Sequence, residues 1–349
     1  METPPSFSEE DREFSIDSSY HLDTDSDPDQ VQPVLGESFT YLGQLILIEK
    51  ELIKLASNKL NPIYESTYGH LLHLRSEKWN IQNHFALNDF SPYLNLFFSM
   101  IETAKEKKYS NLEFLEALRT AMTQGDSFKK EVQKRRKAIS KNKQSLLRYI
   151  ESLFEYRSRL LVLRIDFSYK KDVGGFFTTS EGERISFTNG IKNKALLEKW
   201  SIEVREQRNQ LLKNLKKKYK NDLVGYVWKL EYGADKAFHY HMIFFLDESN
   251  HRQDIKISES IGEMWKQQIT QEKGIYWNCN AKKKHYEKNN RVATGKIKHD
   301  DHELRENLNI MASYLTKPDY FIKLTLPDGA RTFGKGAKPK KIKSGRPRN

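Results

Sequence analysis

Two histidines one residue apart constrain this chain more than any other feature of its sequence. His239 and His241 lie in the run 237–247, which is rich in aromatic and branched residues and closes on a polar Asp-Glu-Ser-Asn turn. Such a run predicts a β-strand. Because side chains two apart on a strand share a face, both imidazoles project together and the apolar residues between them face the other way. The pattern predicts half of a metal site on a rigid element.

The segment before this strand offers a third ligand. Residues 224–233 predict another strand and 233–236 predict a tight turn, so the two strands form a hairpin that brings Glu231 across from the histidines. Two imidazoles and one carboxylate suit Mn²⁺ or Mg²⁺ in phosphate chemistry, and Zn²⁺ stays open. The alternative is a cross-strand ion pair of Glu231 with Lys229 or Lys236.

A later helix carries a candidate nucleophile. Residues 304–317 have helical spacing, and Pro318 stops the helix. Its buried stripe is predicted to be Leu304, Leu308, Met311 and Leu315. Tyr314 and Lys317 are three residues apart and lie beside each other on a neighbouring face. A tyrosine hydroxyl, with a pKa of about 10, attacks phosphorus only with help from a nearby ammonium and a metal-polarised phosphate. The alternative is an amphipathic tyrosine at a helix edge.

In combination, these motifs resemble the HUH endonucleases, in the order found in rolling-circle replication proteins. More narrowly, the chain is similar to the YagK/YfjJ family, replication proteins of filamentous phages (inoviruses) and related prophages in Gram-negative bacteria. The matching segments are Leu163-Arg164-Ile165-Asp166, Glu231-Tyr232-Gly233, Phe238-His239-Tyr240-His241, Tyr314-Leu315-Thr316-Lys317 and Arg331-Thr332-Phe333-Gly334-Lys335. In two respects the chain departs from the superfamily. Tyr240 replaces a bulky aliphatic residue, and no second tyrosine forms a Y-x-x-x-Y pair with Tyr314.

The resemblance implies a metal-dependent, site-specific DNA endonuclease and strand transferase that initiates rolling-circle replication. Glu231, His239 and His241 would hold one divalent cation against the scissile phosphate of single-stranded origin DNA. Tyr314 would attack the phosphorus and Lys317 would favour its phenolate. The product would be a 5′-phosphotyrosine link and a free 3′-OH, which primes synthesis and can later rejoin the strand.

Other readings of the same motifs stay open. A relaxase or a single-tyrosine transposase would share these residues, and a non-catalytic DNA-binding regulator could retain the fold. Termination with one tyrosine needs a second protomer, as in a homodimer, or a reused Tyr314. The sequence has no Walker A motif, so unwinding would fall to a host helicase and the host replication machinery.

Two further sites with acidic residues need an explanation. Asp166 faces away from the apolar residues of its own predicted strand, 160–169, so it either lines the site as a supporting or additional metal carboxylate or pairs with Arg164. Residues 299–302, His-Asp-Asp-His, look like metal ligands, but Asp300 or Asp301 is better explained as the N-cap of the tyrosine helix.

Composition fits a DNA partner inside a bacterial cell. Lys and Arg number 59 against 47 Asp and Glu, which gives a net charge of +12. A basic surface supplies most non-specific affinity for nucleic acid. The single cysteine, Cys279, excludes an internal disulfide and fits a reducing cytoplasm. We see no secretion signal and no apolar stretch of membrane-spanning length, so we expect a cytoplasmic protein that does not engage a membrane. The family resemblance implies that a phage or prophage in a bacterial cell encodes it.

The chain divides into four predicted parts. Residues 1–35 are acidic and rich in Ser, Asp and Pro, which predicts disorder. Residues 36–150 form a helical domain of unknown role, in which the basic stretch 129–148 is either a solvated face or a DNA contact. Residues 155–335 form the endonuclease domain, and residues 336–349 a flexible basic tail. The candidate DNA-binding residues of the tail are Lys338, Lys340, Lys341, Arg346 and Arg348.

The predicted fold class is α+β. Strands and helices alternate between about 155 and 330, which suits an antiparallel sheet with helices on one face. The HUH resemblance implies the same arrangement, a palm with ferredoxin-like or RRM-like layers, here preceded by an all-helical N-terminal region.

Overall fold

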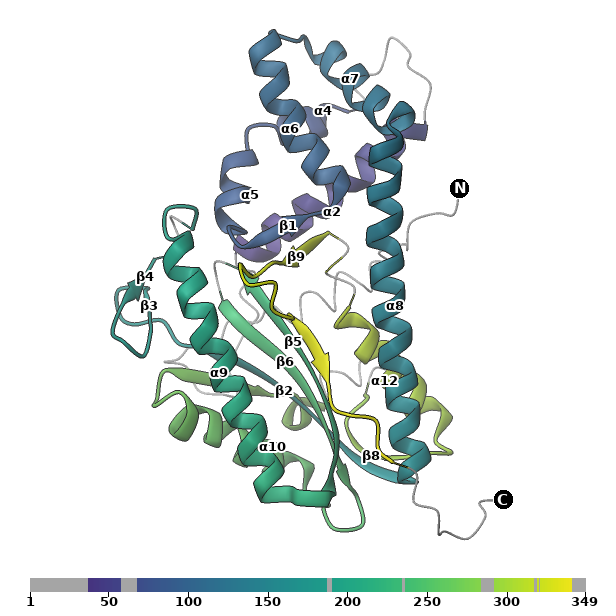
Figure 1. The fold of residues 1–349 in the computed structure, drawn as a ribbon, viewed down its shortest axis with the longest axis vertical. Coiled ribbons are helices and arrows are strands. Elements are labelled where there is room, and N and C mark those ends of the chain that lie inside the picture. Colours follow the sequence, from purple (N-terminus) through teal and green to yellow (C-terminus); the bar gives the residue numbers. More distant parts are fainter. Residues whose placement is uncertain are drawn as a thin grey trace.

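A computed structural model describes residues 37–57, 68–186, 190–233, 236–283, 292–316, 319 and 321–340. Several predictions fall outside these residues: the disordered segment 1–35, Lys317, and the tail residues Lys341, Arg346 and Arg348. In the described part, a group of helices lies at one end of the molecule and a twisted sheet at the other (Figure 1).

The sheet is antiparallel, with the strand order β10-β5-β6-β2-β7, and β8 also pairs with β2. Its strands are β2 (Arg159–Tyr169), β5 (Leu223–Gly233), β6 (Ala237–Asp247), β7 (Gly274–Asn278), β8 (Gly295–Lys298) and β10 (Phe333–Lys335). The three long central strands are the runs richest in branched and aromatic residues. This sheet and its helices confirm the α+β class.

Helices cover both faces of the sheet, so the prediction of helices on one face is wrong. One face packs on α9 (Lys194–Tyr219) and α10 (Asp254–Glu263), and the other on α12 (His302–Tyr314) and the second half of α8 (Asp126–Tyr156). The reason lies in β2, where every residue from Leu160 to Ile165 is buried. A strand that is apolar on both sides needs cover on both sides.

The N-terminal region packs around a second apolar core. Its elements are α2 (Glu37–Ser57), α4 (Gly69–His73), α5 (Lys78–His84), β1 (Asn88–Phe90), α6 (Pro92–Lys107), α7 (Asn111–Gln124) and the first half of α8. A capping box of Ser110 and Glu113 starts α7. The region is helical as predicted, apart from β1. That strand is short and polar, and its partner, β9 (Ile322–Leu324), lies near the other end of the chain, so local sequence gave no signal for it.

The helical region and the sheet are joined by one continuous helix. α8 passes through the predicted boundary at 150–155 without a break. Near its start, Arg135 donates hydrogen bonds to the carbonyl oxygens of Phe90 and Asp319, both at 2.9 Å. α8, Arg135 and the β1–β9 pair therefore fix the segment that follows α12 against the helical region.

Smaller elements complete the fold. β3 (Phe177–Thr178) and β4 (Arg184–Ile185) pair as a small antiparallel sheet between β2 and α9. α10 continues into a π-helical turn, η2 (Met264–Ile269), and two 3-10 turns follow α9 and β7: η1 (Lys220–Asp222) and η3 (Cys279–Lys282). In the described part of the chain, no helix combines the length and the apolar character needed to cross a membrane.

Candidate metal centre

The predicted hairpin forms and sets the positions of all three candidate ligands. β5 and β6 are antiparallel neighbours, with Glu231 opposite His239 and Lys229 opposite His241. On the other side of β6, Asp166 of β2 is also opposite His241. Directly paired residues share a face, and so do residues two apart. The ligands and Asp166 therefore lie on the face covered by α8 and α12, while the intervening Tyr240 is buried in the opposite core, as predicted.

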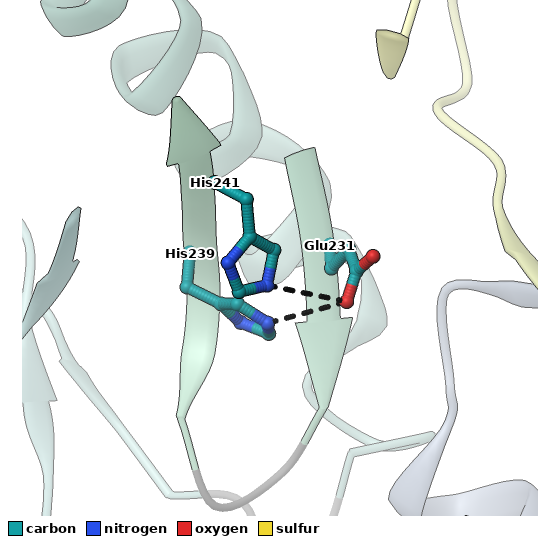
Figure 2. A group of neighbouring side chains, drawn as sticks. All are labelled: Glu231, His239 and His241. Atoms are coloured by element: carbon teal, nitrogen blue, oxygen red, sulfur yellow. Dashed lines mark ion pairs between the residues drawn. The ribbon is translucent and has the colours of Figure 1, made fainter. Parts of the chain in front are cut away.

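The side chains of Glu231, His239 and His241 converge (Figure 2). The Nε2 atoms of His239 and His241 lie 3.5 and 3.7 Å from one carboxylate oxygen of Glu231. These separations exceed those of normal hydrogen bonds. They do suit donors that share an ion at about 2.0–2.2 Å from each. All three donor atoms lie within 4.8 Å of one another, so the group can hold a metal ion.

The other nitrogen of each imidazole faces an acceptor. His239 Nδ1 lies 3.1 Å from the carbonyl oxygen of Ala237, and His241 Nδ1 lies 2.9 Å from a carboxylate oxygen of Asp166. Both contacts favour a proton on Nδ1, so Nε2 is the nitrogen that each ring turns toward Glu231 and would offer to a metal. A carboxylate behind a histidine ligand orients the ring and raises its basicity.

Asp166 lies beside the candidate ligands and also close to Arg164, the two alternatives that the sequence left open. Besides facing His241, it lies 3.6 Å from a guanidinium nitrogen of Arg164, which is itself buried. Asp166 is not part of the group of converging donors. It lies behind His241, and Arg164 balances its charge.

Burial and charge act on these groups in opposite directions. Burial alone would raise the pKa of Glu231, but the two imidazoles hold that pKa well below its usual range. Burial lowers the pKa of His239. Burial would lower the pKa of His241 as well, but Asp166 and Glu231 outweigh it and raise the pKa to about 9. The two carboxylates thus favour positive charge at this point.

We expect Asp166→Asn to weaken metal binding by about 10- to 100-fold, the usual effect of removing a carboxylate that supports a histidine ligand. Titration of Mn²⁺ into the purified variant by calorimetry measures the effect. Asp172→Asn, just beyond the same strand, is the matched control because Asp172 pairs with Arg184 instead. An Mn²⁺ affinity equal to that of the control would rule out a positioning role for Asp166.

The tyrosine helix lies on the same face of the sheet as the ligands. Tyr314 is partly buried against the apolar cluster that includes Val227 of β5 and Ile243 of β6, two residues along from Lys229 and His241. The predicted stripe of α12 packs into this cluster, and Asp301 caps the helix by accepting a hydrogen bond from the Leu304 amide. α12 ends at Tyr314, three residues earlier than predicted, and the position of Lys317 beside it stays a prediction.

Sequence reasoning missed a buried ion pair at this face. Lys229 was considered a partner for Glu231, but its ammonium pairs with Asp319, and the two side chains are 1% and 9% exposed. Asp319 follows α12, so the pair fastens the segment after Tyr314 beside His241. The alternation of side chains along the strand could have revealed this pair. It places Lys229 on the same inward face as Glu231, and a buried lysine needs a carboxylate partner.

We expect Lys229→Met to lower the free energy of unfolding by about 3–5 kcal/mol, because it leaves the Asp319 carboxylate buried without its partner. The double variant Lys229→Met, Asp319→Leu should recover most of this loss, since neither charge remains. Urea denaturation of the three proteins measures the difference. A single variant as stable as the wild type would show that the pair is dispensable.

The predicted tail begins at the edge of the sheet. The Gly336 amide donates to the carbonyl oxygen of Tyr226 at 2.9 Å, which holds the chain to β5 up to this residue. Lys338 and Lys340 beyond it are exposed, as a DNA-contacting role requires.

A comparison with protein families agrees with the motifs. The family model for the YagK/YfjJ C-terminal domain matches residues 122–336, more than half of the chain. The matched region includes α8, the whole central sheet, the three converging ligands and α12. No curated protein and no solved structure matches the chain. On the strength of the family match, this protein belongs to the YagK/YfjJ C-terminal domain family.

Proposed function

We propose that this protein is a metal-dependent HUH endonuclease that nicks and rejoins single-stranded origin DNA in rolling-circle replication. The observation that carries the proposal is the convergence of Glu231, His239 and His241 on a sheet face that also carries the helix of Tyr314. A protein that only binds DNA has no need of two histidines and two carboxylates on one sheet face with a tyrosine on the helix that covers this face.

The donor set fits the cation that this chemistry uses. Glu231, His239 and His241 would hold Mn²⁺ or Mg²⁺ through one oxygen and two nitrogens, with Asp166 behind His241. The bound cation would polarise the scissile phosphate and offset the charge that builds on its oxygens. Glu231 and His239 are partly exposed, with 23% and 12% of their side chains open, so a phosphate can approach from their side.

The chain itself supplies the nucleophile. The Tyr314 hydroxyl oxygen forms a bond to phosphorus, and the bond from phosphorus to the 3′ oxygen breaks. The phenol loses its proton and the departing 3′ oxygen gains one, which leaves a 5′-phosphotyrosine ester and a free 3′-OH. Lys317 would favour the phenolate. Attack by a 3′-OH on the ester reverses the step and rejoins the strand. With one nucleophilic tyrosine per chain, termination falls to a second protomer or to a released Tyr314, and unwinding falls to a host helicase.

Covalent capture tests the proposal. The protein is incubated with Mn²⁺ and single-stranded oligonucleotides that tile the DNA around its own gene, and the products are separated in SDS. We expect an SDS-stable adduct on one oligonucleotide, a released 3′-OH fragment, and loss of both on chelation. Fully paired duplexes of the same sequence are the control. If no oligonucleotide is captured with Mn²⁺ or Mg²⁺ although the protein binds them, the proposed activity is wrong.

A further inference from the structure

The long helix α8 carries a stripe of five basic residues, which we name the α8 stripe: Lys130, Lys134, Lys137, Lys141 and Arg148. All five are exposed. Their spacings of four, three, four and seven residues keep them on one side of a helix with 3.6 residues per turn. At 1.5 Å per residue, the stripe extends over about 27 Å. The buried residues of the same helix, among them Leu146, Ile150 and Leu153, lie on its opposite side.

The α8 stripe lacks the acidic neighbours that usually balance such a surface. Between Asp126 and Glu151, which flank the stripe, Glu131 is the only acidic residue in the sequence, and Glu151 pairs with Arg305. Within the described part of the chain, none of the five stripe residues forms an ion pair. Like charges three and four residues apart destabilise a helix. An ordinary solvated face alternates its charges, so an uncompensated stripe of this length indicates an anionic partner.

The basic surface continues beyond the helix. Lys335 donates hydrogen bonds to the backbone carbonyl and the hydroxyl of Ser145 on α8, and the exposed Lys338 and Lys340 follow it along the chain. The α8 stripe and the start of the tail thus border one another.

We propose that the α8 stripe binds the phosphate backbone of duplex DNA. Proteins that grip single strands combine basic grooves with exposed aromatic platforms for the bases. The stripe has no aromatic residue, because Phe128 packs on the helical core and Tyr149 is buried. Lysine side chains without aromatic neighbours contact the phosphates and not the bases. A continuous duplex exposes its phosphates while its bases stay paired. This inference rests on the proposed function and adds a second DNA contact to it. The α8 stripe would hold duplex DNA beside the origin while the candidate metal centre acts on a single strand.

Two matched variants test the inference. The first is Lys130→Gln, Lys134→Gln, Lys137→Gln, Lys141→Gln, in which glutamine keeps the helix propensity of lysine. The control removes four exposed lysines around α9, on the other side of the sheet, as Lys192→Gln, Lys194→Gln, Lys213→Gln, Lys217→Gln. Fluorescence anisotropy of a duplex of about 20 base pairs, two contacted turns of DNA, gives the affinity over a salt series.

We expect the stripe variant to bind duplex at least about tenfold more weakly than wild type at 0.15 M salt. The slope of log K against log salt should flatten by about 0.9 for each lost contact, hence by about 3 to 4, and the α9 control should keep most of the wild-type slope. Equal losses in the two variants, or no duplex binding by the wild type, would overturn the inference. A stripe variant that loses affinity for a single strand of the same length to the same extent would overturn the assignment to duplex.

These measurements need neither metal nor cleavage, so the two proposals can fail separately. A wild-type protein that binds duplex through the α8 stripe but is never captured on single strands would leave this inference standing and refute the nicking activity. A wild-type protein that is captured normally, but whose stripe variant keeps the wild-type salt slope, would support the nicking activity and refute this inference.

Discussion

Tyr314→Phe should reduce covalent capture on single-stranded DNA by more than about 1000-fold, since removal of a nucleophile takes away the reacting atom itself. The phenylalanine ring keeps the packing of Tyr314 against the apolar cluster under α12. Stability and DNA affinity should therefore stay close to those of the wild type. Denaturing gel analysis of the adduct, with thermal denaturation and anisotropy on the same samples, measures all three quantities.

Tyr276→Phe is a suitable control for this variant. Tyr276 is partly buried on the opposite face of the sheet, where its hydroxyl donates to Glu263 at 2.9 Å. Loss of that hydroxyl should leave the adduct unchanged. If Tyr314→Phe forms as much adduct as the wild type, the nucleophile lies elsewhere, and Tyr320, which is outside the described residues, is the next to substitute.

His241→Gln should lower Mn²⁺ affinity by more than about 100-fold and abolish cleavage at micromolar Mn²⁺. Loss of a residue that merely supports a ligand already costs about 10- to 100-fold, and His241 is both a ligand and the contact of Asp166. Glutamine keeps much of the volume of the buried ring, so the domain should stay folded. His239→Gln should have a similar effect, and Glu231→Ala a milder one if water takes the place of its carboxylate. Calorimetric titration with Mn²⁺ and the capture assay measure the two effects.

His251→Gln is the control for the metal variants. His251 pairs with Asp222 at 3.0 Å, beyond the end of β6, and is not among the converging donors. Its replacement should leave Mn²⁺ affinity and capture intact. Cleavage by the wild type that survives exhaustive chelation would exclude the proposed role of Glu231, His239 and His241.

The convergence of the three donors was predictable because its geometry is local. β5 and β6 are antiparallel neighbours that are close in sequence, so strand alternation alone placed Glu231 on the face of His239 and His241. The side of the sheet on which Asp166 lies followed from the same rule, but its contact with His241 did not, because that contact depends on how β2 pairs with β6. Helix patterning placed Tyr314 on an amphipathic helix and Asp300 or Asp301 at its cap. It could not show that this helix covers the ligand face.

The unpredicted features depend on residues far apart in the chain. Lys229 meets Asp319, and β1 meets β9, across separations that no local pattern reveals. The second helical layer escaped prediction because the strands were expected to bury one face only, and α8 was divided by a boundary drawn from composition. These features depend on contacts between distant segments and on the burial of both faces of the sheet. Both are set only once the chain is folded.

The pairing of β1 with β9 has a consequence for how this chain matures during synthesis. Phe321 and Ile322 pack into the apolar core of the N-terminal helices, and β9 supplies the backbone partners of β1. A ribosome that has released only the first 150 residues has released a helical region that lacks part of its core and has an unpaired strand edge. Such an edge is open to pairing with other chains. The N-terminal region therefore completes its fold only after nearly the whole protein has emerged, and truncation before residue 321 should yield an aggregation-prone product rather than a smaller domain.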